Sequence, residues 1–252
     1  EGLEGVLRAK GDRYSGILNG LDYGVFSPET DGALARNFSA GSLEGKAVCK
    51  NALCSELGLE AEKLPLVAVI SRLVDQKGFD ILCECIDALL SEGCFAFCLL
   101  GSGEKRYEEY FSSLSRNYPG RAVSVIRYDG ELASRIYAGA DIFLMPSRFE
   151  PCGLSQLIAM RYGAIPVVRE TGGLRDTVKP YDESGGTGYG FTFAPYAAHD
   201  LDFTLRRAVN LYKSNFALWK ELTVRAMRQD FSWKKSAKLY TELYASMIKQ
   251  HE

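Results

Sequence analysis

A charged turn that contains glycine lies between an apolar run and a helical pattern in residues 146–157. The apolar run 141–145 is typical of a strand buried on both faces, and the residues from Leu154 onward follow helical spacing. Open α/β sheets bind ligands at the carboxyl ends of their strands, so this turn is a candidate binding loop. The N–H groups of Gly153 and Leu154 suit an anion such as a diphosphate. The carboxylate of Glu150 beside them suits sugar hydroxyls and positive charge on a sugar ring, so the turn fits a sugar nucleotide. A solvated glutamate at a helix entry is the alternative.

A second charged loop follows another apolar run. Residues 66–70 are apolar, and Arg72 and Lys77 lie in the loop after them. Parallel strands end at one edge of a sheet, so we expect both cations to lie at the same edge as Glu150. Two cations fixed there would stabilise a departing diphosphate through charge-assisted hydrogen bonds. A single loop Arg or Lys is usually only a solvent-facing charge, whereas two at one edge favour a binding role.

Two further turns follow predicted strands. In Gly101-Ser102-Gly103 the glycines allow the backbone to approach a ribose or a phosphate, and an ordinary tight turn is the alternative. Thr171-Gly172-Gly173 also follows a strand, and its N–H groups open the next helix.

These turns connect segments that alternate between strand and helix. Such alternation predicts an α/β fold with a doubly wound parallel sheet that resembles a Rossmann fold. Strands are predicted at 66–71, 95–101, 122–127, 141–145, 165–169 and 189–193. Helices are predicted at 46–57, 78–91, 104–117, 131–139 and 154–162, and in succession from residue 198. Ser232 is predicted to cap a last helix whose apolar stripe runs from Trp233 to Met247.

Together these motifs resemble the bacterial glycogen synthases and plant starch synthases, which are retaining glucosyltransferases of the two-domain GT-B type. The resemblance covers essentially the whole chain. It rests on Ser71-Arg72-Leu73, Gln76-Lys77-Gly78, the run from Pro146 to Leu157, Tyr162-Gly163 with Pro166, the run from Thr171 to Val178, Gly188-Tyr189-Gly190-Phe191 and Asp230-Phe231-Ser232-Trp233. The segments 19–22 and 27–31 resemble the family's entry into its carboxyl-terminal domain.

The resemblance implies a set of site residues. Arg72, Lys77 and Glu150 would be catalytic, with the two cations neutralising the leaving diphosphate. Tyr128 resembles the family residue that packs on adenine, and a rim tyrosine is the alternative. The N–H groups of 171–173 would bind the diphosphate or the glucose hydroxyls. The implied donor-binding residues are Asn19, Ser71, Gly101, Ser102, Tyr128, Cys152, Gly153, Leu154, Thr171, Gly172 and Gly173.

One departure from other GT-B enzymes bears on the donor. Many of them have a second glutamate eight residues after the first, where this chain has Ile158. Cys152 and Gln156 stand here as cysteine and glutamine do in glycogen and starch synthases, which by analogy favours ADP-glucose over UDP- or GDP-sugars. The implied reaction transfers glucose with retention from ADP-glucose to the non-reducing end of an α-1,4-glucan, without a cofactor or a metal.

Two alternatives to this enzyme stay open. One is a GT-B transferase that uses another sugar nucleotide, and the other is a non-catalytic nucleotide- or glucan-binding module. Degenerate modules usually lose the charged triad, so the presence of Arg72, Lys77 and Glu150 favours an enzyme.

The family's amino-terminal domain contains a glycine loop with a lysine, and a histidine near the reacting sugar. This chain has neither feature, because His199 and His251 lie outside every motif. We therefore expect the chain to be a donor-binding, carboxyl-terminal half that lacks its amino-terminal GT-B domain and is weak or inactive alone. Its expected divisions are a remnant of that domain with a linker at 1–18, a Rossmann-like domain at 19–230, and a crossover helix at 231–252.

Composition excludes several other classes. The 252 residues are 46% hydrophobic and 25% charged, which is enough for one sizeable core. A net charge of −2 gives no basic field for nucleic acid or an anionic membrane, and no apolar run approaches the ~20 residues of a membrane helix. The seven cysteines lack paired Cys-x-x-Cys spacing, which predicts no metal site and, for all but Cys152, reduced core thiols. Cys152 lies at a predicted helix start beside cations and is expected to contact the substrate without acting as a nucleophile. The expected location is the cytoplasm in a bacterium, or the plastid in a plant or alga.

Overall fold

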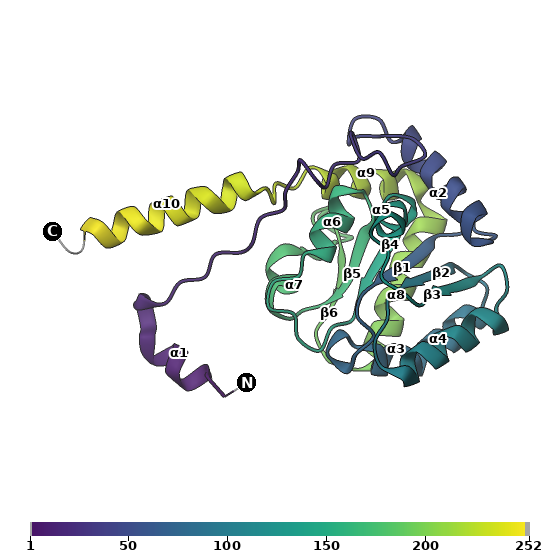
Figure 1. Cartoon of the computed structure of the whole chain (residues 1–252), viewed down its shortest axis with the longest axis horizontal. Coiled ribbons are helices and arrows are strands. Elements are labelled where there is room, and N and C mark those ends of the chain that lie inside the picture. The colour runs from purple at the N-terminus through teal and green to yellow at the C-terminus, as the bar shows by residue number, and fades with distance from the viewer. Residues whose placement is uncertain (1, 250–252) are drawn as a thin grey trace. The chain divides into compact units, whose positions relative to one another are not determined.

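The computed structural model describes residues 2–249, which divide into two compact units. The larger unit is 23–229, and the smaller one combines the segments before residue 23 and after residue 229. The larger unit contains a six-stranded sheet in the order β3-β2-β1-β4-β5-β6, with every pair parallel (Figure 1). The strands are β1 (Leu66–Ile70), β2 (Ala96–Leu100), β3 (Ala122–Val125), β4 (Ile142–Met145), β5 (Ile165–Arg169) and β6 (Phe191–Phe193). The predicted doubly wound fold is confirmed.

Helices cover both faces of this sheet (Figure 1). One face carries α2 (Glu44–Leu57), α5 (Gly130–Gly139) and α6 (Ser155–Arg161). The other carries α3 (Phe79–Ser91), α4 (Lys105–Asn117) and α8 (Ala198–Ser214). The remaining elements of this unit are the 3-10 turn η2 (Asp75–Lys77), α7 (Gly172–Thr177) and α9 (Phe216–Met227). None of the helices in the described part of the chain has the length and apolarity to cross a membrane.

The strands form because their side chains can be buried on both faces. All residues of β2 and β4 are buried, as expected for the central part of a parallel sheet. Aromatic rings complete the core beneath α3 and α4, where Phe79 and Phe111 meet edge to face with centroids 5.5 Å apart. Two predicted strands extend two residues beyond the observed strand at one end. β3 ends at Val125 because Arg127 N–H turns back to the Val125 carbonyl, and β6 begins later because residues 189 and 190 bond to Lys179 instead.

The smaller unit contains α1 (Glu4–Lys10), the 3-10 turn η1 (Gly11–Arg13) and α10 (Trp233–Lys249). The two chain segments of this unit pair at Leu21, whose N–H donates to Phe231 O at 2.7 Å and whose carbonyl accepts from Trp233 N at 3.3 Å. The last helix starts directly after Ser232, as predicted, and its apolar stripe is largely exposed. In the larger unit, Tyr23 Oη donates to Gln229 O at 3.2 Å, so this unit begins and ends at neighbouring points.

The seven cysteines are all free thiols. Cys49, Cys54, Cys85 and Cys98 are buried, and burial raises the pKa of the Cys85 thiol to about 12. The prediction of core thiols is wrong for Cys83 and Cys94, which are partly exposed because they lie on a helix edge and in a loop. Cys152, which was expected to contact the donor, is also partly exposed. No group of three or more His, Cys, Asp and Glu suited to a metal ion occurs among residues 2–249.

Candidate functional site

The strand order places β1 beside β4, and the chain leaves these two strands toward opposite faces of the sheet. Such a switch point opens a crevice at the carboxyl ends of the strands, where doubly wound folds bind ligands. Ser71, Arg72 and Lys77 follow β1, and the segment from Glu150 to Leu154 follows β4. The structure therefore brings the two predicted loops to the two sides of the switch point.

Lys77 and Glu150 meet directly across this switch point. Lys77 Nζ lies 2.5 Å from Glu150 Oε2, and the two side chains are only 18% and 8% exposed. Ser147, itself buried, donates its Oγ hydrogen to the same carboxylate oxygen at 3.3 Å. A small cavity of about 20 Å³ beside the pair is lined by Ser71, Lys77, Ser147 and Ser155, together with the ends of β1 and β4. The motifs predicted a shared edge but did not predict that these two side chains form an ion pair.

The turn that carries Lys77 is clamped on both sides. Gln76 O accepts from Arg148 N at 2.9 Å, which ties η2 to the loop after β4. On its other side Asp75 accepts hydrogen bonds from Tyr107 and Arg106 of α4. These bonds, first from Tyr107 and then from Arg106, hold the pKa of Asp75 below its ordinary value, so its carboxylate stays charged at neutral pH. Lys77 is thus held on a rigid turn.

Gly78 is required at the end of that turn. Its φ is +78°, and a Cβ added there would lie 2.1 Å from Pro146 O. We expect Gly78→Ala to lower the free energy of unfolding by about 3 kcal/mol, because strain and a backbone clash add together. Gly58→Ala is the matched control, because Gly58 has φ +66° and open space around it, and it should cost only about 1 kcal/mol. Urea titration compares the two, and equal losses would mean that the contact with Pro146 is unimportant.

Arg72 presents its charge at the carboxyl edge of the sheet. The side chain is exposed and makes no hydrogen bond or ion pair with any residue between 2 and 249. Many other arginines of this unit pair with carboxylates, as Arg106 does with Asp75 and Arg135 with Glu56. Arg72 is therefore a free cation at the carboxyl edge, which suits an anionic ligand.

The backbone amides of the two glycine turns differ in availability. The N–H groups of Gly153, Leu154 and Gly172 meet no acceptor in the described part of the chain. Gly173 N–H donates to Glu150 O at 3.0 Å, and Thr171 N–H donates to Arg169 O at 2.9 Å, so neither is available to a ligand in this structure. Gly173 instead permits a close approach, since a Cβ there would lie 2.0 Å from Cys152 O. The two turns consequently pack against each other.

The Gly101-Ser102-Gly103 turn has a structural reason for its glycines. A Cβ on Gly101 would lie 1.8 Å from Ser71 O, and one on Gly103 would lie 2.3 Å from Leu73 O. Leu73 N–H also donates to Ser102 O at 3.0 Å. The turn after β2 therefore fits tightly against the loop after β1, which favours the tight-turn alternative for the two glycines. Ser102 is exposed beside them.

Three more predicted site residues take no part in the ion pair between Lys77 and Glu150: Tyr128, Cys152 and Asn19. Tyr128 follows β3 and is 94% exposed, so its ring faces solvent at the carboxyl edge. Cys152 is partly exposed in the loop after β4. Asn19 is exposed and belongs to the smaller unit, outside the group of loops described above.

The motifs did not identify Tyr196, which follows β6 at the same edge. The guanidinium carbons of Arg148 and Arg169 lie 5.0 and 5.3 Å from the centre of its ring, and its hydroxyl donates to Asp80. Arg169 Nη1 also donates to Arg148 O at 2.6 Å. The rule that selected the other loops, a polar residue directly after a strand, would also have selected Tyr196.

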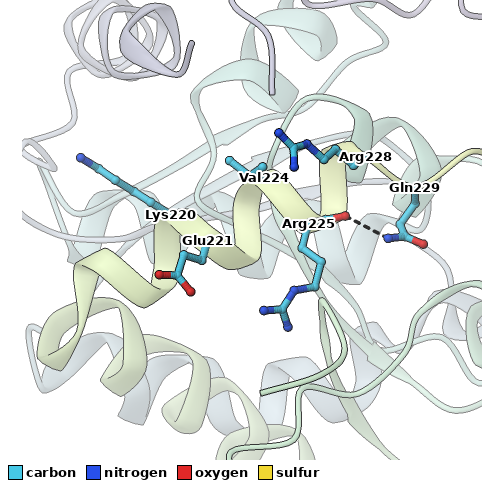
Figure 2. Close-up of a pocket in the computed structure, with 6 residues that line it drawn as sticks. All are labelled: Lys220, Glu221, Val224, Arg225, Arg228 and Gln229. Atoms are coloured by element: carbon cyan, nitrogen blue, oxygen red, sulfur yellow. Dashed lines mark hydrogen bonds between the residues drawn. The ribbon is translucent and has the colours of Figure 1, made fainter. Parts of the chain in front are cut away.

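Larger hollows lie away from this edge. One of about 720 Å³ lies at the amino ends of β1 and β4, where Lys50 Nζ pairs with Asp141 at 2.7 Å. Burial alone would lower the pKa of Lys50, but Asp141 and Tyr212 raise it above its ordinary value. Another hollow of about 450 Å³ follows one face of α9 (Figure 2). Neither is lined by a predicted site residue.

Comparison with known proteins gives the family of the chain. Residues 56–218 match the family model of the glycosyl transferases group 1. Over its whole length the chain is 46% identical to a glycogen synthase from Geobacillus thermodenitrificans, of which it covers 52%. The chain thus spans about half the length of the curated relatives it matches.

Solved structures give the same result. The catalytic domain of starch synthase IV from Arabidopsis thaliana, bound to ADP and acarbose, superposes with a TM-score of 0.91 at 39% identity. The match covers 98% of this chain and 52% of that one. The carboxyl-terminal domain of a group 1 glycosyl transferase from Francisella tularensis shares the fold, with a TM-score of 0.60 at 14% identity over 82% of this chain and 95% of that domain.

Proposed function

The chain belongs to the glycosyl transferases group 1, and from this premise we propose that it is the donor-binding half of a glycogen or starch synthase. The whole enzyme would transfer glucose from ADP-glucose to the non-reducing end of an α-1,4-glucan. The observation that carries the proposal is the contact between Lys77 and Glu150 across the β1/β4 switch point. It places a cation for a diphosphate next to a carboxylate for a sugar, which is the order of these groups in a sugar nucleotide.

In the proposed complex the diphosphate of the donor draws Lys77 away from Glu150. Arg72 and the free N–H groups of Gly153 and Leu154 add further donors to the phosphate oxygens. Glu150, released from Lys77, then accepts hydrogen bonds from the glucose hydroxyls and offsets positive charge on the ring. The bond between the anomeric carbon and the phosphate oxygen breaks as the 4-hydroxyl of the glucan attacks. ADP leaves with the bonding electron pair, and its phosphate oxygen takes the hydroxyl proton.

ADP-glucose as donor is supported by two of the relatives. The Geobacillus protein that resembles this chain is named a glycogen synthase, and the Arabidopsis starch synthase was solved with ADP and acarbose. The carboxyl edge described here contains donor-side groups, and we propose that an amino-terminal GT-B domain supplies the remainder of the site and contributes to binding of the glucan acceptor. A two-domain site is completed by closure, so the 252-residue chain should bind the donor more weakly than the whole enzyme.

Calorimetric titration of the chain with ADP, UDP and ADP-glucose tests the proposal. We expect ADP and ADP-glucose to bind and UDP to bind about tenfold more weakly or not at all. A parallel assay for incorporation of glucose into glycogen should show no turnover by the chain alone. Preference for UDP would favour a transferase for another sugar nucleotide, and absence of binding to all three would contradict the proposed donor site.

A further inference from the structure

Gln156 is a wholly buried amide next to the candidate site. The residue is 0% exposed and lies in the first turn of α6. Its Nε2 donates to the carbonyl oxygens of Cys152 at 3.2 Å and Gly153 at 2.9 Å, and lies 3.1 Å from Thr177 Oγ1. The Thr177 hydroxyl gives its own hydrogen to Gly173 O at 2.6 Å, so it accepts from Gln156. One side-chain amide therefore ties the loop after β4 to α7.

These contacts set the direction of two backbone amides. In a trans peptide the C=O and N–H groups point in opposite directions. The Cys152 carbonyl shares its peptide with the N–H of Gly153, and the Gly153 carbonyl shares its peptide with the N–H of Leu154. Because both carbonyls point inward to Gln156, both N–H groups point outward, where the loop is partly exposed and no acceptor among residues 2–249 meets them.

The oxygen of the same amide has no partner. Gln156 Oε1 is buried and unpaired among the described residues, and it lies 2.4 Å from the place that a Cβ on Gly153 would occupy. A buried acceptor without a donor is destabilising, yet turning the amide over would bring Oε1 against two carbonyl oxygens. The Gln156 side chain is therefore held only through the hydrogen bonds that its Nε2 group donates within the described residues.

We infer that Gln156 is a positioning residue that aims the N–H groups of Gly153 and Leu154 at the diphosphate of the donor. This inference rests on the proposed function of the site. Gln156 itself stays buried beneath the loop and does not touch the ligand. Without the hydrogen bonds from Gln156 Nε2, the carbonyls of Cys152 and Gly153 are free to rotate. The N–H groups of Gly153 and Leu154 then lose their common direction.

Gln156→Met tests this role, because methionine has a similar length and no donor. We expect it to weaken binding of ADP to the chain by about tenfold or more. The thermal unfolding midpoint should fall by about 2–6 °C, because buried carbonyl oxygens lose their donor. Gln229→Met is the matched control, since Gln229 Nε2 also donates to a backbone carbonyl, that of Arg225 on α9, at 3.0 Å (Figure 2). Unchanged ADP affinity in Gln156→Met would overturn the inference alone, whereas failure of the wild-type chain to bind ADP would overturn the proposed function and the inference with it.

A second measurement on the wild-type chain keeps the inference testable if Gln156→Met does not fold. Saturating ADP should shift the amide proton signals of Gly153 and Leu154 to lower field in the nitrogen-15 correlation spectrum, as new hydrogen bonds to phosphate form. The signal of Gly173 should move much less, because its N–H already donates to Glu150 O. Binding of ADP without a shift at Gly153 and Leu154 would show that these amides are not aimed at the ligand.

Discussion

Glu150→Gln in a full-length protein that includes this chain is expected to lower turnover about 10²- to 10³-fold while ADP binds at least as tightly as before. Turnover falls because an amide offsets positive charge on the sugar ring far less than a carboxylate does. ADP affinity is maintained because the substitution removes the anion that competes with the diphosphate for Lys77, 2.5 Å away. Steady-state kinetics in the full-length protein and calorimetry on the chain measure the two effects separately.

The control for Glu150→Gln is Glu56→Gln. Glu56 also pairs with a cation, but this cation is Arg135, which donates to both carboxylate oxygens of Glu56 at 3.0 Å each on the surface between α2 and α5. This variant should change neither turnover nor ADP affinity. A tenfold loss of ADP affinity in Glu150→Gln would mean that Glu150 shapes the phosphate site and does not compete with it.

Lys77→Ala is expected to lower turnover by about tenfold or more, because the leaving diphosphate loses a cation held on a clamped turn. It should also lower the free energy of unfolding by about 3 kcal/mol, since among residues 2–249 the mostly buried Glu150 carboxylate then keeps the hydroxyl of Ser147 as its one side-chain partner. Kinetics and urea titration measure these two effects. Unchanged turnover would contradict the catalytic role of Lys77.

The double variant Lys77→Ala with Glu150→Gln separates stability from catalysis. It removes both charges, so much of the lost stability should return while turnover stays low. Lys105→Ala is the surface control, because Lys105 pairs with Glu109 along the exposed side of α4. Recovery of turnover in the double variant would show that Lys77 acts only by neutralising Glu150.

The fold was largely predictable because its strands are local apolar runs. β1, β2 and β4 lie within one residue of their predicted limits, since burial on both faces leaves a continuous apolar signal. The ends of β3 and β6 were not predictable, because hydrogen bonds to Val125 and Lys179 end or delay these strands, and apolar character does not report such bonds.

The site was predictable at the level of loops but not of contacts. Charged residues after strands placed Arg72, Lys77 and Glu150 at one edge, but their pairing depends on the strand order, which brings β1 next to β4. The same limit applies to Gly101 and Gly173, whose neighbours Ser71 and Cys152 come from other loops. Contacts between residues far apart in the chain, such as that between Gln156 and Thr177, leave no local signal.

Tyr23 and Gln229, where the larger unit begins and ends, are joined by a hydrogen bond. A unit with adjacent ends can be inserted into an exposed loop of a host protein without separating the two sides of that loop. Residues 23–229 are therefore suited to insertion, as one domain, into another protein. With the proposed donor site, such an insert would report ADP through the stability of an unrelated host protein.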